Sequence, residues 1–97
     1  MERGGYIYIL TNKNHTVLYT GVTSNLSDRL YEHRIGKYKS SFTFKYNVEE
    51  LVYYEEFISI EEAINREKQI KAGSRQKKED LISRLNPEWK DLTQTIE

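Results

Sequence analysis

The sequence predicts an α/β protein of the α+β kind, with a small three-stranded mixed or antiparallel sheet flanked by helices. Two runs rich in Tyr, Ile, Val and Thr, residues 6–11 and 17–23, lie on either side of a turn-forming segment. A third such run at residues 51–57 follows a segment with helical spacing and precedes another helix. The 97 residues are enough for one domain, and we expect that domain to span residues 1–97.

The first two runs should form a β-hairpin, because residues 12–16 between them are turn formers. Side chains alternate between the two faces of a strand. Tyr8 therefore shares a face with Tyr6 and Leu10 of the first run, and Tyr19 shares a face with Gly21 of the second. If the register permits, Tyr8 and Tyr19 project from the same side of the hairpin.

A helix is expected to begin after Asn25, a good N-cap, and to end near Gly36. Asp28 lies in its first turn, where a negative charge favours the positive end of the helix. The stretch at residues 37–47 alternates Lys, Ser, Thr and aromatic residues and is interpreted as a loop. The third strand follows at residues 51–57.

The next helix carries a specific start signal, the capping box Ser59-Ile60-Glu61-Glu62. We expect this helix to run to Ala72, with Gly73 as the residue after its end. A step of about 100° per residue places Glu67 inside the apolar stripe of this helix. An unpaired buried carboxylate costs several kcal/mol, so Glu67 requires a structural ion pair, hydrogen bonds from Tyr hydroxyls, or a metal or catalytic role.

The last segments are expected to complete the core. Ser74 can cap a further helix that runs through Leu85. Asn86-Pro87 then offers a cap and first-turn pair for a final short turn carrying Trp89 and Leu92.

The composition excludes several classes of protein. The chain has no Cys, which rules out a disulfide scaffold, a thiolate zinc site and a cysteine nucleophile. No apolar run approaches the ~20 residues of a membrane span, and no signal-peptide core follows the N-terminal Met, so we expect a cytoplasmic protein. The sequence also lacks a His-x-x-x-His pair, a calcium-loop pattern and a glycine-rich phosphate loop.

Charge is unevenly distributed, although 15 basic and 15 acidic residues give a net charge of zero. Basic residues dominate residues 29–45 and residues 66–78, where a single Glu stands in each block. Residues 49–62 hold acids and no base. The charge pattern alone fits a set of solvated faces as well as it fits a polyanion-binding surface.

One combination of motifs is more specific than any of these patterns. Tyr6-Ile7-Tyr8 and Tyr19-Thr20-Gly21 form two triplets with ten residues between Tyr8 and Tyr19, and Arg29, His33 and Glu67 follow in order. In this combination the chain resembles the GIY-YIG nuclease family from residue 6 to about residue 78. It is most similar to the small bacterial members related to the nuclease module of the excision-repair incision subunit.

The chain departs from the family pattern at three points. Tyr6 replaces the first Gly of the first triplet, and Thr20 replaces the Ile of the second. Several family nucleases carry an Asn beyond the Glu helix, whereas this sequence has none between Glu67 and Asn86.

The resemblance implies a metal-dependent endonuclease that hydrolyses DNA phosphodiester bonds, in DNA repair or recombination, with Mg²⁺ or Mn²⁺ as cofactor. It implies a metal held by Glu67, a scissile phosphate clamped by Arg29 and a general base at Tyr8, which needs neighbouring positive charge from Arg29 or the metal. Tyr19 and His33 would position water or phosphate. DNA contacts are expected from basic residues of both blocks, namely Arg34, Lys37, Lys39, Lys68, Lys71, Arg75, Lys77 and Lys78.

Two alternatives remain open at this point. The chain could be a catalytically weak or inactive nucleic-acid-binding module that acts with a partner, since a minimal domain can lack the contacts that fix a substrate for attack. It could also be a protein-interaction adaptor that uses the acidic residues 49–62 as a docking face. A protein partner supplying specificity fits either view, and the sequence leaves the oligomeric state open.

Overall fold

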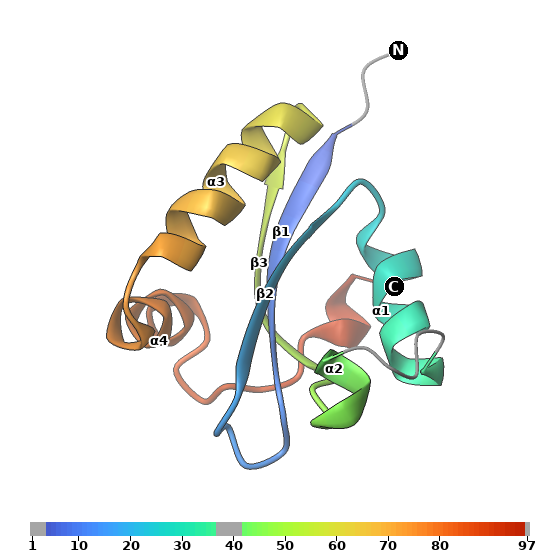
Figure 1. Cartoon of the computed structure of the whole chain (residues 1–97), viewed down its shortest axis with the longest axis vertical. Helices are drawn as coiled ribbons and strands as arrows, with labels where there is room; N and C mark the ends of the chain where they lie inside the picture. Colours follow the sequence, from blue (N-terminus) through green and yellow to red (C-terminus); the bar gives the residue numbers. More distant parts are fainter. Residues whose placement is uncertain (1–3, 37–41, 97) are drawn as a thin grey trace.

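An antiparallel three-stranded sheet with strand order β2-β1-β3 forms the centre of the molecule (Figure 1). The computed structural model describes residues 4–36 and 42–96. Along the chain, the elements in these residues are β1 (Gly5–Thr11), β2 (Leu18–Thr23), α1 (Leu26–Ile35), α2 (Phe42–Lys45), β3 (Glu50–Phe57), α3 (Ile60–Ala72), α4 (Arg75–Leu85) and the 3₁₀ helix η1 (Thr93–Thr95). The predicted fold class is confirmed, and the sheet is antiparallel.

The hairpin register places the two candidate tyrosines on one face of the sheet. Tyr8 lies opposite Gly21, and Leu10 lies opposite Tyr19. Directly paired residues of antiparallel strands project to the same side, so Tyr8 and Tyr19 are diagonal neighbours on a shared face. This confirms the sequence-based expectation. The pairing of β1 with β3 is interrupted by a bulge between Ile9 and Leu10.

Helices cover both faces of the sheet. The face towards α3 and α4 buries an aliphatic core made mainly of Ile7, Ile9, Val52, Ala63, Ile70 and Ile82. The opposite face packs against α1 and the C-terminal segment through Tyr8, Leu10, Leu26, Leu30, Val48 and Leu51. Central strand β1 contributes to both cores, since its successive side chains alternate between the faces. Tyr8 is therefore held by the most enclosed strand of the sheet.

The predicted helix boundaries hold because their signals are local. Asn25 accepts a hydrogen bond from the backbone N–H of Asp28, and Ser59 accepts one from that of Glu62. Gly36 ends α1 in the left-handed conformation at a φ of 67°, which favours glycine. The third helix ends at Ala72 as expected, although the following Gly73 is extended rather than left-handed. No helix in the described residues is long and apolar enough to cross a membrane.

The interpretation of residues 37–47 as a loop is wrong for its second half, where Phe42–Lys45 form the short helix α2. The backbone N–H of Tyr46 donates to the carbonyl of Phe42 at 3.1 Å, and Val48 donates to Thr43 at 2.8 Å. The aromatic ring of Phe44 packs closely over Gly36, which anchors α2 against the end of α1. Because this anchor is a tertiary contact, no local sequence pattern predicts α2. Residues 37–41 lie outside the described part.

The C-terminal segment folds around Asn86, close to the predicted cap and turn. The Asn86 side chain donates to the carbonyl of Val52 at 3.0 Å and accepts from the backbone N–H of Lys90 at 3.1 Å. A turn from Asn86 to Trp89 follows, closed by a 2.9 Å backbone hydrogen bond. Leu92 lies beyond this turn and donates its N–H to Leu51, which fastens the segment to β3.

Candidate active site

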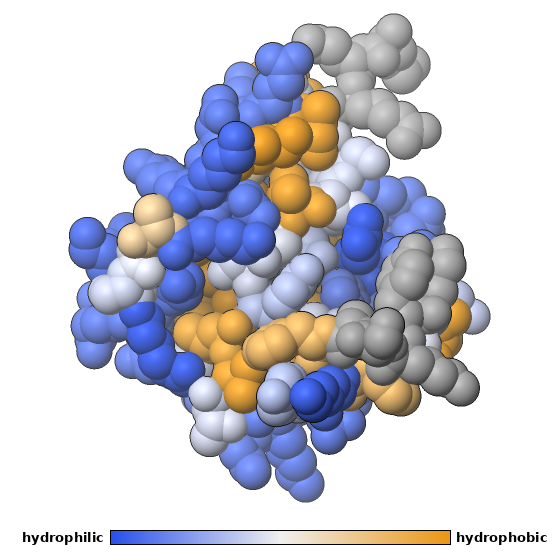
Figure 2. Space-filling view, in the orientation of Figure 1, coloured by the Kyte–Doolittle hydropathy of each residue, from blue (hydrophilic) through white to orange (hydrophobic). Residues whose placement is uncertain are grey.

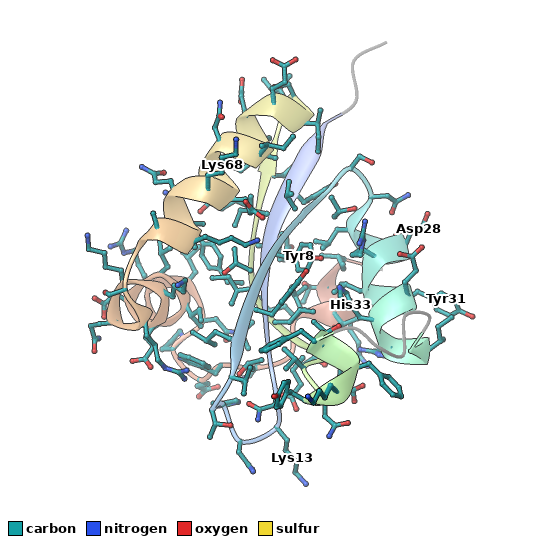
Figure 3. The ribbon with its side chains drawn as sticks, viewed as in Figure 1. Tyr8, Lys13, Asp28, Tyr31, His33 and Lys68 are labelled. Carbon is teal, nitrogen blue, oxygen red and sulfur yellow. The ribbon has the colours of Figure 1, made fainter. Side chains whose placement is uncertain are left out.

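The hydroxyl of Tyr8 lies at one end of a polar chain between the sheet and α1 (Figure 3). It lies 3.2 Å from Nε2 of His33, and Nδ1 of the same imidazole lies 2.8 Å from the Thr43 hydroxyl on α2. His33 is thus held at both nitrogens. Because the three residues come from β1, α1 and α2, only the tertiary fold brings them together.

Tyr19 completes an aromatic cluster with these groups. Its ring centre is 6.3 Å from that of Tyr8 and 5.9 Å from that of His33, and the Tyr8 and His33 rings meet edge to face at 6.0 Å. Three of the five catalytic residues predicted from the sequence therefore lie in mutual contact.

The pKa of Tyr8 is raised far above its ordinary value. Burial is the main cause, because Tyr8 is only 1% exposed, and the neighbouring Tyr19 adds to it. The charges of Glu32 and Glu67 raise this pKa further, whereas Arg29 lowers it. Sequence reasoning required positive charge from Arg29 or a metal near Tyr8; in this structure the effect of burial on the pKa of Tyr8 outweighs that of Arg29. The same interactions place Arg29 and Glu67 within electrostatic reach of the hydroxyl.

The pKa of His33 is lowered, first by burial and then by the positive charge of Arg29, with Glu32 acting in the opposite direction. A lowered pKa keeps the imidazole neutral at neutral pH. If Nδ1 carries the proton and donates to Thr43, Nε2 is free to accept one from Tyr8. This tautomer would make His33 a proton acceptor for Tyr8.

Arg29 lies on α1 at the edge of the cluster and is partly exposed. Its Nε is 3.7 Å from the carboxylate of Glu32, one turn further along the helix. Sequence reasoning missed both Glu32 and Thr43 as members of the site. The i,i+3 spacing from Arg29 was a signal for Glu32. Thr43 had none, because its segment was interpreted as a loop.

Glu67 is largely buried on α3, with a side chain 14% exposed, and its Oε2 lies 2.8 Å from Nζ of Lys71. This i,i+4 ion pair is one of the compensations that its helical position demanded. Within the described residues there is no group of three or more His, Asp or Glu side chains able to hold a metal. A single carboxylate still fits Mg²⁺, which takes few protein ligands together with waters and phosphate oxygens.

A surface hollow runs along the edge strand β2 beside this cluster. We call it the β2 hollow; its lining residues are Leu18, Tyr19, Thr20, Phe42, Lys71 and Lys78. Figure 2 shows apolar side chains gathered on this face over the first part of β2 and towards α2. Two of the predicted DNA-binding lysines, Lys71 and Lys78, therefore lie beside the aromatic cluster.

The other predicted DNA-binding residues are dispersed. Lys68 is exposed on α3, and Lys77 lines a separate hollow between α3 and α4. Arg75 donates to the carbonyls of His15 and Thr16, both at 2.9 Å, and so fastens α4 to the hairpin turn.

Arg34 has an intramolecular partner as well, since its guanidinium donates to the Thr93 hydroxyl at 3.3 Å. The predicted contacts Lys37 and Lys39 lie outside the described residues. Of the eight basic residues, Lys71 and Lys78 are therefore the ones that this structure brings to the aromatic cluster.

Comparison with known proteins shows the family of this chain. Residues 4–80 match the family described as the GIY-YIG catalytic domain. A UPF0213 protein of Syntrophus aciditrophicus is 43% identical over 86% of this chain and 93% of its own length. A UPF0213 protein of Natronomonas pharaonis is 41% identical over 86% of this chain and 95% of its own length.

A solved structure is similar as well. The solution NMR structure of a UPF0213 protein from Bacillus halodurans shares 34% sequence identity and superimposes with a TM-score of 0.58. The similarity covers 94% of this chain and 95% of that one.

Proposed function

Because this chain belongs to the GIY-YIG family of catalytic domains, we propose that it is a metal-dependent endonuclease that hydrolyses DNA phosphodiester bonds. The observation that carries the proposal is the setting of the Tyr8 hydroxyl. It lies 3.2 Å from Nε2 of His33. The charge of Arg29 lowers its pKa and that of Glu67 raises it. Phosphodiester hydrolysis needs a proton acceptor, a cation for the developing charge and a ligand for a metal, and these residue types supply all three.

Arg29 is the proposed phosphate clamp. Its planar guanidinium donates two parallel hydrogen bonds to phosphate oxygens, which suits a trigonal-bipyramidal transition state better than the point charge of Lys. Arg29 is partly exposed and its Glu32 contact at 3.7 Å is loose, so the guanidinium is available to a substrate. Glu32 would then orient the arginine from behind.

Tyr8 and His33 are the proposed proton-accepting pair. A buried tyrosine with a raised pKa is a poor base by itself. Neutral His33 at 3.2 Å removes this difficulty, because Tyr8 can pass its own proton to Nε2 as it takes one from the attacking water. Tyr19 packs against both rings and would keep them aligned.

Glu67 is the proposed metal ligand, and a divalent ion bound there would neutralise charge on the leaving oxygen. The carboxylate is held by Lys71 at 2.8 Å in the structure. For metal binding, this ammonium group must move away from the carboxylate. Lys71 is exposed on a flexible stem, so its ammonium is free to rotate away, and the β2 hollow offers it a position from which to contact a DNA phosphate.

Substrate access requires a second movement. Tyr8 is 1% exposed, so its hydroxyl reaches the attacking water only after a neighbouring side chain shifts. Because catalysis depends on precise placement of the reacting groups, we expect slow turnover by the isolated chain. The setting that we propose is DNA repair or recombination, with a protein partner that supplies specificity.

The test is cleavage of end-labelled linear, nicked and branched DNA at low salt with Mg²⁺ or Mn²⁺. Glu67→Gln and Arg29→Lys keep side-chain size and should each reduce the rate about 10²-fold or more. Glu61→Gln, an exposed position in the first turn of the same helix, is the matched control and should cleave at the wild-type rate. Equal cleavage by wild type and Glu67→Gln would refute the proposal.

A second candidate function is a nucleic-acid-binding module with little catalysis of its own. The buried Tyr8 and the Glu67–Lys71 ion pair favour it, because both catalytic groups are occupied in this structure. Salt-dependent DNA binding without cleavage on any of these substrates would support the module. In that case Glu67→Gln should bind DNA as tightly as wild type, or more tightly.

A further inference from the structure

Two aromatic side chains, one on α2 and one directly after it, take part neither in the core nor in the proposed chemistry. Phe42 is 48% exposed and Tyr46, directly after the helix, is 44% exposed. Neither belongs to the buried clusters on the two faces of the sheet. Large rings grouped at a surface mark a binding site more often than isolated ones do.

These rings continue the aromatic cluster outwards. Phe42 stacks on Tyr19 with ring centres 6.2 Å apart and an angle of 25°, and Tyr46 lies 4.8 Å from Phe42. Tyr8, Tyr19, Phe42 and Tyr46 thus form a row of neighbouring rings, which we call the aromatic row. It leads from the buried hydroxyl of the candidate active site to the surface.

Positive charge accompanies the aromatic row. The ammonium of Lys45 lies 5.5 Å from the ring centre of Tyr46. Lys71 and Lys78 line the β2 hollow together with Tyr19 and Phe42, and no carboxylate lines this hollow among the residues that the structure describes. Figure 1 shows α2 on one side of β2, with α3 and α4 on the other. The hollow therefore has aromatic rings towards one side and lysine side chains towards the other. In this structure the Lys71 ammonium contacts Glu67, and that of Lys78 donates to the Gly73 carbonyl.

Nucleic-acid strands with unpaired bases match this arrangement. Bases stack on exposed aromatic rings, while lysines follow the phosphates. A base in a duplex has both faces covered by its neighbours, so only an unpaired base can use such a surface. The direct contact between Phe42 and Tyr19 places a stacked base next to the candidate active site.

We propose that Phe42 and Tyr46 form a stacking platform for unpaired nucleobases, so that the preferred substrate is DNA that is single-stranded beside the cleaved phosphate. The inference rests on the proposed nuclease function and specifies its substrate class. Lys45, Lys71 and Lys78 contact the backbone of the same strand.

The experiment measures binding separately from cleavage. Fluorescence anisotropy with EDTA present gives the affinity for a labelled oligo(dT) and for a hairpin duplex of matched length. Phe42→Leu and Tyr46→Leu keep apolar bulk but lose the ring face, and each should weaken oligo(dT) binding about tenfold while leaving duplex binding within about twofold. Phe42→Tyr should restore oligo(dT) binding.

Tyr31→Leu is the matched control. Tyr31 is also an exposed tyrosine, but it lies on α1 and points away from the strands (Figure 3). This variant should bind both probes as the wild type does. Thermal melting of every variant reports whether it is folded.

Several outcomes would overturn the platform. Unchanged oligo(dT) binding by Phe42→Leu and Tyr46→Leu is one, and an equal loss for oligo(dT) and duplex is another. A wild-type dimer that Phe42→Leu converts to a monomer would show that a second copy covers these rings. The nuclease proposal is tested separately, by the cleavage assay with Glu67→Gln. If oligo(dT) binding depends on the rings but no DNA is cleaved, the platform stands as a strand-binding site and the nuclease proposal is rejected.

Discussion

The ring of Tyr8 lies over the backbone of Gly21 on the neighbouring strand, so a side chain at position 21 would clash with it. A Cβ atom at position 21 would stand 2.4 Å from both Cζ and the hydroxyl oxygen of Tyr8. Van der Waals contact begins about 1 Å further out. The glycine of the second triplet therefore makes room for the tyrosine of the first.

Gly21→Ala should displace the Tyr8 ring and weaken the protein by about 1–3 kcal/mol, as overpacking in a tight core does. Thermal melting measures the stability, and cleavage or DNA binding reports the site. Gly73→Ala is the control, because a Cβ there comes no closer than 3.3 Å to any neighbour. Equal melting temperatures for Gly21→Ala and wild type would contradict the close fit.

His33 should make stability depend on pH in a defined direction. Its pKa is lowered by folding, so the unfolded chain binds more protons than the folded one between the lowered pKa and the unfolded value of about 6.5. The contribution of neutral His33 to the free energy of unfolding is therefore complete above about pH 6.5. This contribution is lost as the pH falls towards the folded-state pKa of His33. Urea unfolding at pH 8 and pH 5 should show that His33→Gln costs more at pH 8. A cost that is equal at both pH values, or larger at pH 5, would contradict the assignment.

A second polar cluster, on β3 and α3, should be structural. The Tyr53 hydroxyl donates a short hydrogen bond to Glu55, and burial together with this carboxylate raises the pKa of Tyr53 to about 12. Arg66 holds the same carboxylate through Nε and Nη2 at 3.0–3.3 Å. Glu55→Ala leaves the buried hydroxyl without its acceptor and should cost about 1–3 kcal/mol in urea unfolding.

Glu56→Ala is the control for this substitution, since Glu56 is exposed and accepts only a longer bond, of 3.2 Å, from Tyr6. Its loss of stability should be smaller. DNA cleavage by either variant should match wild type, and a large loss of cleavage in Glu55→Ala at full folding would assign that cluster to the active site instead.

Lys71→Met should tighten metal binding. The ammonium at 2.8 Å competes with a cation for Glu67, and removing an ion pair whose lysine is exposed should favour cation binding to the carboxylate by about 1 kcal/mol. Calorimetric titration with Mn²⁺ should show about two- to fivefold higher affinity. Lys68→Met changes the net charge equally on the same helix and is the control. An equal gain in both variants would mean that general electrostatics, rather than the Lys71 contact, is responsible.

The features that were predictable from the sequence are those controlled by short-range geometry. The caps at Asn25 and Ser59 connect atoms three residues apart, so they need no tertiary context. The period of two along each strand allowed Tyr8 and Tyr19 to share one face, and the hairpin register of the structure places them there. The helical period likewise placed Glu67 among apolar residues, which made a compensating partner necessary.

By itself, then, the sequence determined where the sheet and most helices form, and its motifs indicated the family. Only the tertiary structure decided the protonation of the site, because burial of Tyr8 depends on how distant segments pack over β1. It also placed the Thr43 hydroxyl beside His33 and packed the Phe44 ring of α2 over Gly36. Finally, it directed the Arg75 guanidinium to the backbone of the hairpin turn. These outcomes arise from contacts between segments far apart in the chain, whose geometry and desolvation are absent from local spacing.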